Sequence, residues 1–342
     1  MLKLRRGIVT ATDSLRVRIG EEERVAWADE SLVGEIREGD ELILNTEAQD
    51  LGLGSGGFDI VHVNLTRGLD APGAAEAAAL KLNYTSLQHP VEPVEALEGG
   101  GVDRRIPGLV LSLHGQLAPA AWAAGRARDD LRVGYIQTSG GALPGSLSKD
   151  VAELRRLGLI CGHITAGSAY GGELEAVTVV GALQAAAGKL GWDAVIAGPG
   201  PGIVGSGTEL GHGGIEVLEV AHASLMLGLD TLLAPRMSSS DPRPRHRGLS
   251  HHTETVLRML LGRVRVPAPA PRGVDSSLDE LRQACGDRHE IWPRGVAIDE
   301  YAVSGLPTTH MGREIAEDRL FFAAALASGD ALASATLAEL AA

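Results

Sequence analysis

Residues 132–164 read RVGYIQTSGGALPGSLSKDVAELRRLGLICGHI, and this stretch carries the clearest sign of the fold class. It begins with an apolar run at 132–136 that is typical of a buried strand, followed by a loop rich in glycine and serine. A helical pattern over 149–157 and a second apolar run at 159–164 come next. A strand, a helix and a second strand in this order predict two parallel strands joined by a helix that covers one face of the sheet.

The same alternation continues along the chain from residue 106 onward. Strand patterns occur at 109–113, 194–197, 231–234 and near 295–298, and helical patterns at 119–128, 173–190, 215–227, 253–261, 277–284 and 315–327. We therefore expect an α/β domain over 106–342, with a mostly parallel, doubly wound, Rossmann-like sheet that carries helices on both faces.

The N-terminal part has a different pattern, in which short strands alternate with polar turns. The strands are expected at 7–10, 16–19, 24–27, 41–44 and 59–63. This regular spacing predicts a small antiparallel β-barrel of SH3 or OB type over residues 1–66. Residues 67–105, with an extended segment at 80–84, are expected to form a linker or arm. An OB barrel can bind oligonucleotides, but the acidic run at 21–23 and the lack of exposed aromatics favour a structural or oligomerisation role.

Composition narrows the class of protein. The chain has 342 residues, 44% of them hydrophobic, and a formal net charge of -13, which disfavours duplex nucleic acid as a partner. Its two cysteines, Cys161 and Cys285, form no CxxC motif and suit a reducing compartment, so the cytoplasm is expected. The longest apolar stretch, 176–188, is too short to span a bilayer and contains Gln184, so no membrane role is expected.

One segment has the opposite charge to the rest of the chain. Residues 236–253 read RMSSSDPRPRHRGLSHHT, with four arginines, three histidines and one carboxylate. A basic segment in an acidic protein is either a flexible arm or a binding site for an anion. It lies between an expected buried strand and an expected helix, which favours the site. Among these side chains, Arg243, Arg245 and Arg247 are expected to bind the anion, because guanidinium groups hold carboxylates and phosphates with paired hydrogen bonds.

The loops that follow the expected strands carry further candidates, because ligands of open parallel sheets bind beyond the carboxyl ends of the strands. Backbone and hydroxyl donors to the anion are expected from Gly140, Gly141, Gly200, Gly202, Ser168 and Thr208. Glycine in any single loop is equally well explained by turn geometry. The expected catalytic groups are His251 or His252 as general acid or base, with Ser139 as a hydroxyl donor.

Two cofactor hypotheses compete with direct anion binding. Gly200-Pro-Gly-Ile-Val-Gly205 matches GxGxxG, but no helix opens at its third glycine, so a nicotinamide dinucleotide is disfavoured. A divalent metal could be held by His212 and His246 with Glu209, although this spacing is not diagnostic, and contact of the anion with arginine is preferred. His114, His62 and His89 are assigned structural roles. His310 and Arg313 are assigned to an ordinary loop and helix start unless they fold over the crevice.

The segment MSSSDPRPRHRGLSHHT, together with AGPGPGIVGSGTELGHGG at 197–214 and the β-rich N-terminus, resembles an uncharacterised bacterial family, domain of unknown function 3866. The resemblance extends over nearly the whole chain. It implies a soluble, full-length bacterial protein and supplies no catalytic residue.

Two classes of function remain open from the sequence. The leading hypothesis is an enzyme, a hydrolase or group transferase, that acts on a small phosphorylated or carboxylated metabolite at the strand-end crevice. The competing hypothesis is a non-catalytic metabolite-binding protein or a homo-oligomeric scaffold, in which the Arg/His loop pairs with an acidic patch of a neighbouring copy. A homo-oligomer is expected in either case.

Overall fold

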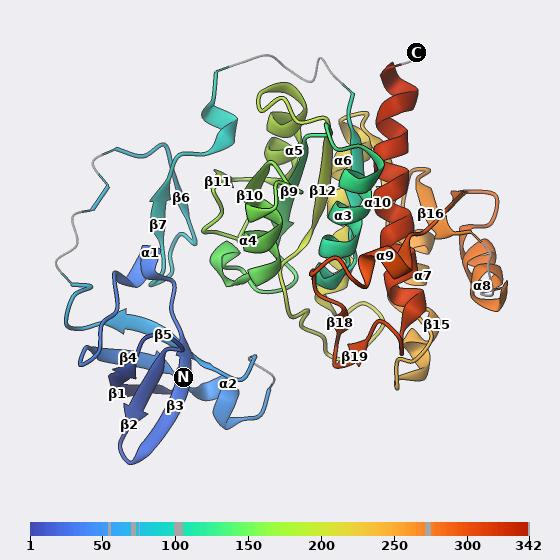
Figure 1. Cartoon of the computed structure of the whole chain (residues 1–342). Helices are drawn as coiled ribbons and strands as arrows, with labels where there is room; N and C mark the ends of the chain where they lie inside the picture. The colour runs from blue at the N-terminus through green and yellow to red at the C-terminus, as the bar shows by residue number, and fades with distance from the viewer. Residues whose placement is uncertain (54–55, 70–72, 75, 99–104, 271–274, 341–342) are drawn as a thin grey trace. The chain divides into compact units, whose positions relative to one another are not determined.

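The computed structural model describes residues 1–53, 56–69, 73–74, 76–98, 105–270 and 275–340 (Figure 1). The chain divides into two compact units, Met1–Pro90 and Val91–Ala342. Within the expected linker at 67–105, residues 70–72, 75 and 99–104 lie outside the described part of the chain. Its extended segment forms β6 (Ala79–Lys81), which pairs with β7 (His89–Val91).

The N-terminal unit contains a closed five-stranded barrel, as the sequence predicts. Its strands follow one another around the barrel as β1 (Leu4–Ala11), β2 (Arg16–Ile19), β3 (Glu22–Trp27), β5 (Asp59–Asn64) and β4 (Glu41–Asn45). The short helices α1 (Glu30–Val33) and α2 (Glu47–Asp50) follow β3 and β4. Alternate residues such as Val17, Leu42 and Leu44 fill the interior. The pairing of β3 with β5 is parallel, and this Greek-key path is that of an OB-type barrel.

The second unit is built on an eight-stranded sheet in which every neighbouring pair is parallel. From one edge to the other its strands are β11 (Leu174–Ala176), β10 (Gly162–Ala166), β9 (Val133–Thr138), β12 (Ala194–Pro199), β8 (Pro107–Val110), β13 (Asp230–Leu233), β16 (Arg265–Pro269) and β17 (Glu290–Arg294). The central strands are buried along their whole length, which explains their continuous apolar sequences.

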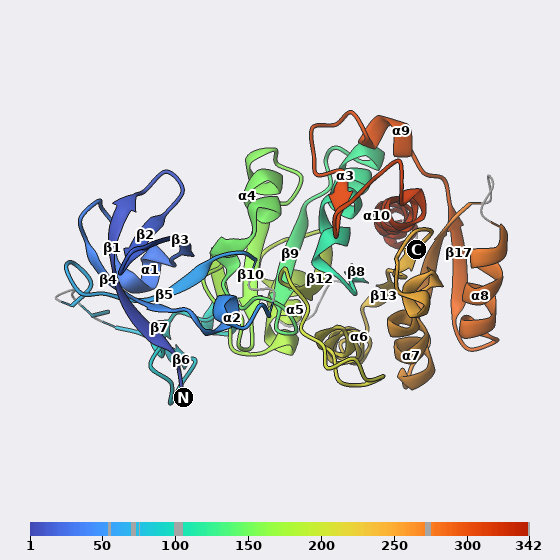
Figure 2. The same ribbon diagram turned by 90° about the horizontal axis from the view of Figure 1, so that it is seen from below.

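Helices cover both faces of this sheet, which confirms the doubly wound, Rossmann-like class (Figure 2). One face carries α5 (Val179–Gly188), α6 (Val217–Met226), α7 (His251–Met259) and α8 (Asp275–Cys285). The other carries α3 (Leu117–Ala127), α4 (Lys149–Arg156), α9 (Ile298–Tyr301) and α10 (Arg319–Leu340). None of the helices in the described part of the chain combines the length and apolarity that a membrane crossing requires.

Several elements differ from the sequence-based expectation, and the helix expected over 315–327 runs instead from Arg319 to Leu340 as α10. The helix expected over 173–190 begins only at Val179, because Leu174–Ala176 pairs with β10 as an edge strand and Thr178 caps the helix. Strand β16 overlaps the Pro-rich stretch at 266–271, where no strand was expected. The strand expected near 295–298 lies earlier, as β17, and residues 298–301 form α9 instead.

The sheet also explains a glycine in β9. A Cβ atom at Gly134 would overlap the ring of Trp192, which is buried and packs over β9 and β10. We expect Gly134→Ala to lower the free energy of unfolding by about 1–3 kcal/mol, because overpacking displaces the indole or the strand. Chemical denaturation measures this change. Gly295→Ala is the control, since a Cβ atom there meets nothing within 4 Å, and an equal loss in both variants would contradict the packing argument.

Candidate functional site

A cavity of about 510 Å³ lies at the carboxyl ends of the central strands. Its wall comes from the loops after β8, β12 and β13, from the start of α7, and from the hairpin of β18 (Thr309–His310) and β19 (Arg313–Glu314). Parallel strands end at the same edge of a sheet, so loops that are far apart in sequence meet there. We call this cavity the histidine pocket.

Nine of the nineteen described residues that line the histidine pocket carry a guanidinium or imidazole group. They are Arg236, Arg243, Arg245, His114, His212, His246, His251, His252 and His310. No aspartate or glutamate is among the described residues that line it. This balance of charge is unusual in a chain with a net charge of -13, and it suits a negatively charged ligand.

A buried carboxylate beneath the pocket holds its arginines in place. Asp241 is fully buried, and its two oxygens accept hydrogen bonds from Arg243 at 3.0 and 2.9 Å. The same carboxylate lies 3.4 Å from Arg236, which is itself buried, and 3.6 Å from Arg313. Burial opposes ionisation of Asp241, but the hydrogen bonds from Arg243 and the charge of Arg236 hold the pKa of this carboxyl well below its usual range.

Arg236 fixes the hydrogen-bonding state of His252. Its Nη1 lies 3.2 Å from Nδ1 of His252, and a guanidinium can only donate, so Nδ1 accepts and the ring proton lies on Nε2. The His252 ring is stacked on His212, with centroids 3.6 Å apart. Burial and the neighbouring His212 and Arg236 lower the pKa of His252 to about 2. At neutral pH this side chain is therefore an uncharged N–H donor.

His246 is held in the same way by a serine. Its Nδ1 lies 2.7 Å from Oγ of Ser250, and that oxygen accepts the backbone N–H of His252 at the start of α7. The only other described group within reach of the buried Ser250 hydroxyl is Nδ1 of His246, so the hydroxyl donates to it and leaves the ring proton on Nε2. Burial and nearby arginines lower the pKa of His246 to about 3.

His251 has no such restraint. It is the first residue of α7, and its Nε2 is buried with no hydrogen-bond partner among the described residues. Burial and the charge of Arg245 lower the pKa of His251. Within this trio of histidines it is thus the imidazole whose proton position no described hydrogen bond fixes.

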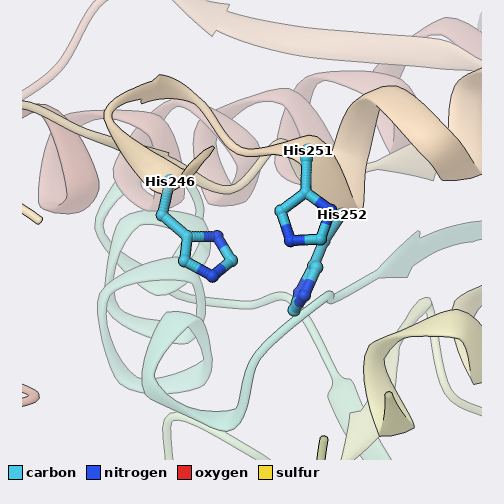
Figure 3. Close-up of side chains that lie close together, drawn as sticks. All are labelled: His246, His251 and His252. Atoms are coloured by element: carbon cyan, nitrogen blue, oxygen red, sulfur yellow. The ribbon is translucent and has the colours of Figure 1, made fainter. Parts of the chain in front are cut away.

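The same three histidines lie close enough together to hold a metal ion. Figure 3 shows the rings of His246, His251 and His252 turned towards a common space. One nitrogen from each ring lies within 4.8 Å of the others. A metal needs nitrogen lone pairs, yet the bonds from Arg236 and Ser250 occupy the Nδ1 lone pairs of His252 and His246, so that their Nε2 atoms carry protons. The geometry therefore favours an anion over a cation.

The comparison with protein families agrees with the resemblance in the sequence. The model of the family described as "Protein of unknown function (DUF3866)" matches residues 25–329. The chain belongs to this family. The matched range includes every residue of the histidine pocket, so in this DUF3866 member the pocket is built wholly from the family domain. No curated protein and no solved structure matches the chain.

The structure of this DUF3866 chain places about half of the sequence-based candidates in the pocket wall. These are Gly202, Thr208, His212, Arg243, Arg245, His246, His251 and His252. Seven others do not line it: Ser139, Gly140, Gly141, Ser168, Gly200, Glu209 and Arg247. Glu209 forms an ion pair with Arg258 instead of joining His212 and His246. Ser168 is exposed in the loop after β10.

Three of the glycines outside the pocket serve contacts between loops. A Cβ atom at Gly141 would overlap the carbonyl oxygen of Gly200, and one at Gly200 would overlap that of Ala142. Gly140 is closely packed against Gly213 and the carboxyl group of Glu216. Ser139 hydrogen-bonds this carboxyl, whose pKa is raised by burial to about 7. Backbone packing therefore accounts for these glycines without a ligand.

Three of the arginine and histidine residues of the pocket were not expected there. Arg236 belongs to the basic segment, yet no role was assigned to it. His114, assigned a structural role, lines the pocket and lies 2.7 Å from Oγ of Ser148 through its Nε2. His310 stacks on Phe321 with centroids 3.8 Å apart and reaches over Gly115, where a Cβ atom would be 2.6 Å from its Nδ1. The position of His114 directly after an expected strand was the sequence feature that could have placed it in the pocket.

Proposed function

We propose that the histidine pocket binds a small phosphorylated or carboxylated metabolite and that the protein is a hydrolase or group transferase acting on it. The observation that carries this proposal is the wall itself, in which guanidinium groups and uncharged imidazole N–H donors occur without a lining carboxylate. Such groups bind an anion through charge-assisted hydrogen bonds. The free cysteines, Cys161 and Cys285, support our placement of the protein in the reducing cytoplasm.

The residues of the pocket would have different roles. Arg245 would bind the anion directly, because its guanidinium is exposed and its hydrogen bond goes to the carbonyl of Gly207. His246 and His252 would donate their Nε2–H groups. His251 would act as general acid or base, since an anion bound beside it would raise its pKa back towards neutrality.

Binding of anions to variants of Arg245 tests this proposal. We expect Arg245→Gln to weaken the binding of phosphate, or of the best metabolite from a thermal-shift screen, by about tenfold or more, because a charged hydrogen bond contributes about 1.5–3 kcal/mol. Isothermal titration calorimetry measures the dissociation constant. Arg263→Gln, an exposed arginine paired with Glu290 outside the pocket, is the matched control. Equal affinities in both variants would refute anion binding in the pocket.

A second variant separates an enzyme from a binding protein. If His251 transfers protons, His251→Gln retains the ligand but loses its turnover. If the wild-type protein binds the ligand and leaves it unchanged, the catalytic part of the proposal fails and the binding part stands. Metal analysis of the same samples tests the cation alternative.

A further inference from the structure

A second hollow, of about 620 Å³, adjoins the histidine pocket. It lies between the segment 244–251 and residues of α7 and α8, and Arg247 and Arg288 are in its wall. Arg245 and His251 line both cavities. The two cavities are thus neighbours across these two side chains. We call the second one the arginine hollow.

The charge of the arginine hollow is poorly neutralised. Arg245, Arg247 and Arg288 donate to the backbone carbonyls of Gly207, Asp241 and Arg258, at 3.1, 3.3 and 3.2 Å. None of the three has a carboxylate partner among the described residues, whereas many other arginines of the chain do, as Arg126 does with Glu300. A carbonyl orients a guanidinium without cancelling its charge, so each keeps free N–H donors.

The carboxylates of the hollow offset only part of these charges. Glu280 accepts the backbone N–H of Leu249 at 2.7 Å, which ties it to the base of the segment. Glu254 is exposed on α7. Arg258 contributes a further positive charge to the wall, although it is paired with Glu209. Apart from the Arg258–Glu209 pair, three guanidinium groups therefore lie with two carboxylates in this wall, which leaves the hollow positively charged.

We infer that the arginine hollow binds a second anionic group of the same ligand, so that the protein recognises metabolites with two anionic groups joined by a linker. This inference rests on the proposed function of the histidine pocket and adds the class of ligand. A single ligand is favoured because Arg245 and His251 line both cavities, so the two cavities meet at these side chains. It also gives Arg247 a role, although this residue does not line the histidine pocket.

Synthetic phosphates that differ only in their second anionic group test the inference. The probes are alkanediol bisphosphates with short, medium and long chains, each compared with the alkyl monophosphate of the same length by calorimetry on the whole protein. At the best chain length we expect the bisphosphate to bind about tenfold or more tightly than the monophosphate, because the second contact is intramolecular. Arg247→Gln should remove most of this gain and change the affinity for the monophosphate by less than about twofold.

Two further variants keep the test decisive. Arg288→Gln should also remove most of the gain, as Arg247→Gln does. Because Arg288 donates to carbonyls at the end of α7, this variant could fail to fold. In that case the result for Arg247→Gln decides the test. Arg282→Gln, on α8 and paired with Asp279 outside the hollow, is the control and should keep the gain.

The outcomes distinguish this inference from the proposed function. Binding of the monophosphate with no gain from a second phosphate at any chain length, or a gain that survives Arg247→Gln, overturns the inference alone. Failure of every phosphate probe to bind overturns the proposed function for phosphorylated ligands and the inference with it. A gain that depends on Arg247 and Arg288 but not on Arg282 supports both.

Discussion

We expect Asp241→Asn to lower the free energy of unfolding at neutral pH by about 3–5 kcal/mol, because it leaves a buried arginine without its counter-charge. Asp241 is fully buried, and only 4% of the surface of Arg236 is exposed. The carboxylate also accepts two hydrogen bonds from Arg243, so its loss affects two arginines that line the pocket. An asparagine retains the size of the side chain but not its charge. Urea denaturation monitored by circular dichroism measures the change.

The control for this variant is Asp279→Asn. Asp279 is exposed and pairs with Arg282 on the surface of α8, where an ion pair contributes about 1 kcal/mol or less. A loss below about 1 kcal/mol in Asp241→Asn as well would show that the buried carboxylate does not stabilise the arginines. If the variant fails to fold in water, added phosphate should restore part of its stability, because a bound anion supplies the missing negative charge.

Mild acid should destabilise the protein strongly. Burial lowers the pKa to about 4 in His163 and His310, to about 3 in His246 and to about 2 in His252. Each of these histidines binds a proton more weakly when folded than when unfolded, where the pKa is about 6.5. The unfolded state therefore gains protons first as the pH falls. The stabilisation that these neutral histidines contribute is fully present above about pH 6.5, and it decreases as the pH falls towards their pKa values in the folded state.

The size of this effect follows from the number of groups. One pKa unit corresponds to about 1.4 kcal/mol, so four histidines acting together should cost about 3–4 kcal/mol between roughly pH 6.5 and 5.5. Denaturation curves recorded across this range measure the loss. His252→Gln removes one of the groups and should reduce the proton uptake on unfolding by about one at the acid end. A free energy of unfolding that stays constant down to pH 5.5 would contradict the assignment of these imidazoles as buried and neutral.

The main elements of the fold followed from local patterns, and the exceptions have physical causes. In β16, residues 267 and 269 are prolines and lack N–H groups. Because they lie two positions apart, their backbone N–H positions point to the same neighbouring strand. The N–H of Ala270 points the other way and bonds to the carbonyl of Arg294 in β17. The missing donors therefore fall on the side of β13, where only Leu232 and Arg265 pair. A pattern of proline alone does not reveal which neighbour a strand will have.

The strand β11 shows a related difficulty. Leu174–Ala176 is as compatible with a helix as with a strand, and a helix was expected. Pairing with Ile164, Thr165 and Ala166 of β10 makes it a strand. Hydrogen bonding at the edge of a sheet is a contact between segments, so it overrides the weak local preference of three residues.

For the candidate site too, local sequence patterns predicted some features and tertiary contacts decided the others. Hydrophobic periodicity and local charge are properties of neighbouring residues, so they were enough to indicate the parallel sheet, the barrel and the basic segment at 236–253. They could not show that Asp241 neutralises Arg236 and Arg243, that His310 closes over Gly115, or that Arg247 lies beside the neighbouring hollow. Nor could they assign the protons of His246 and His252. Those features depend on which side chains meet after folding, because a hydrogen bond or a pKa is set by the groups within a few ångströms and not by distance along the chain.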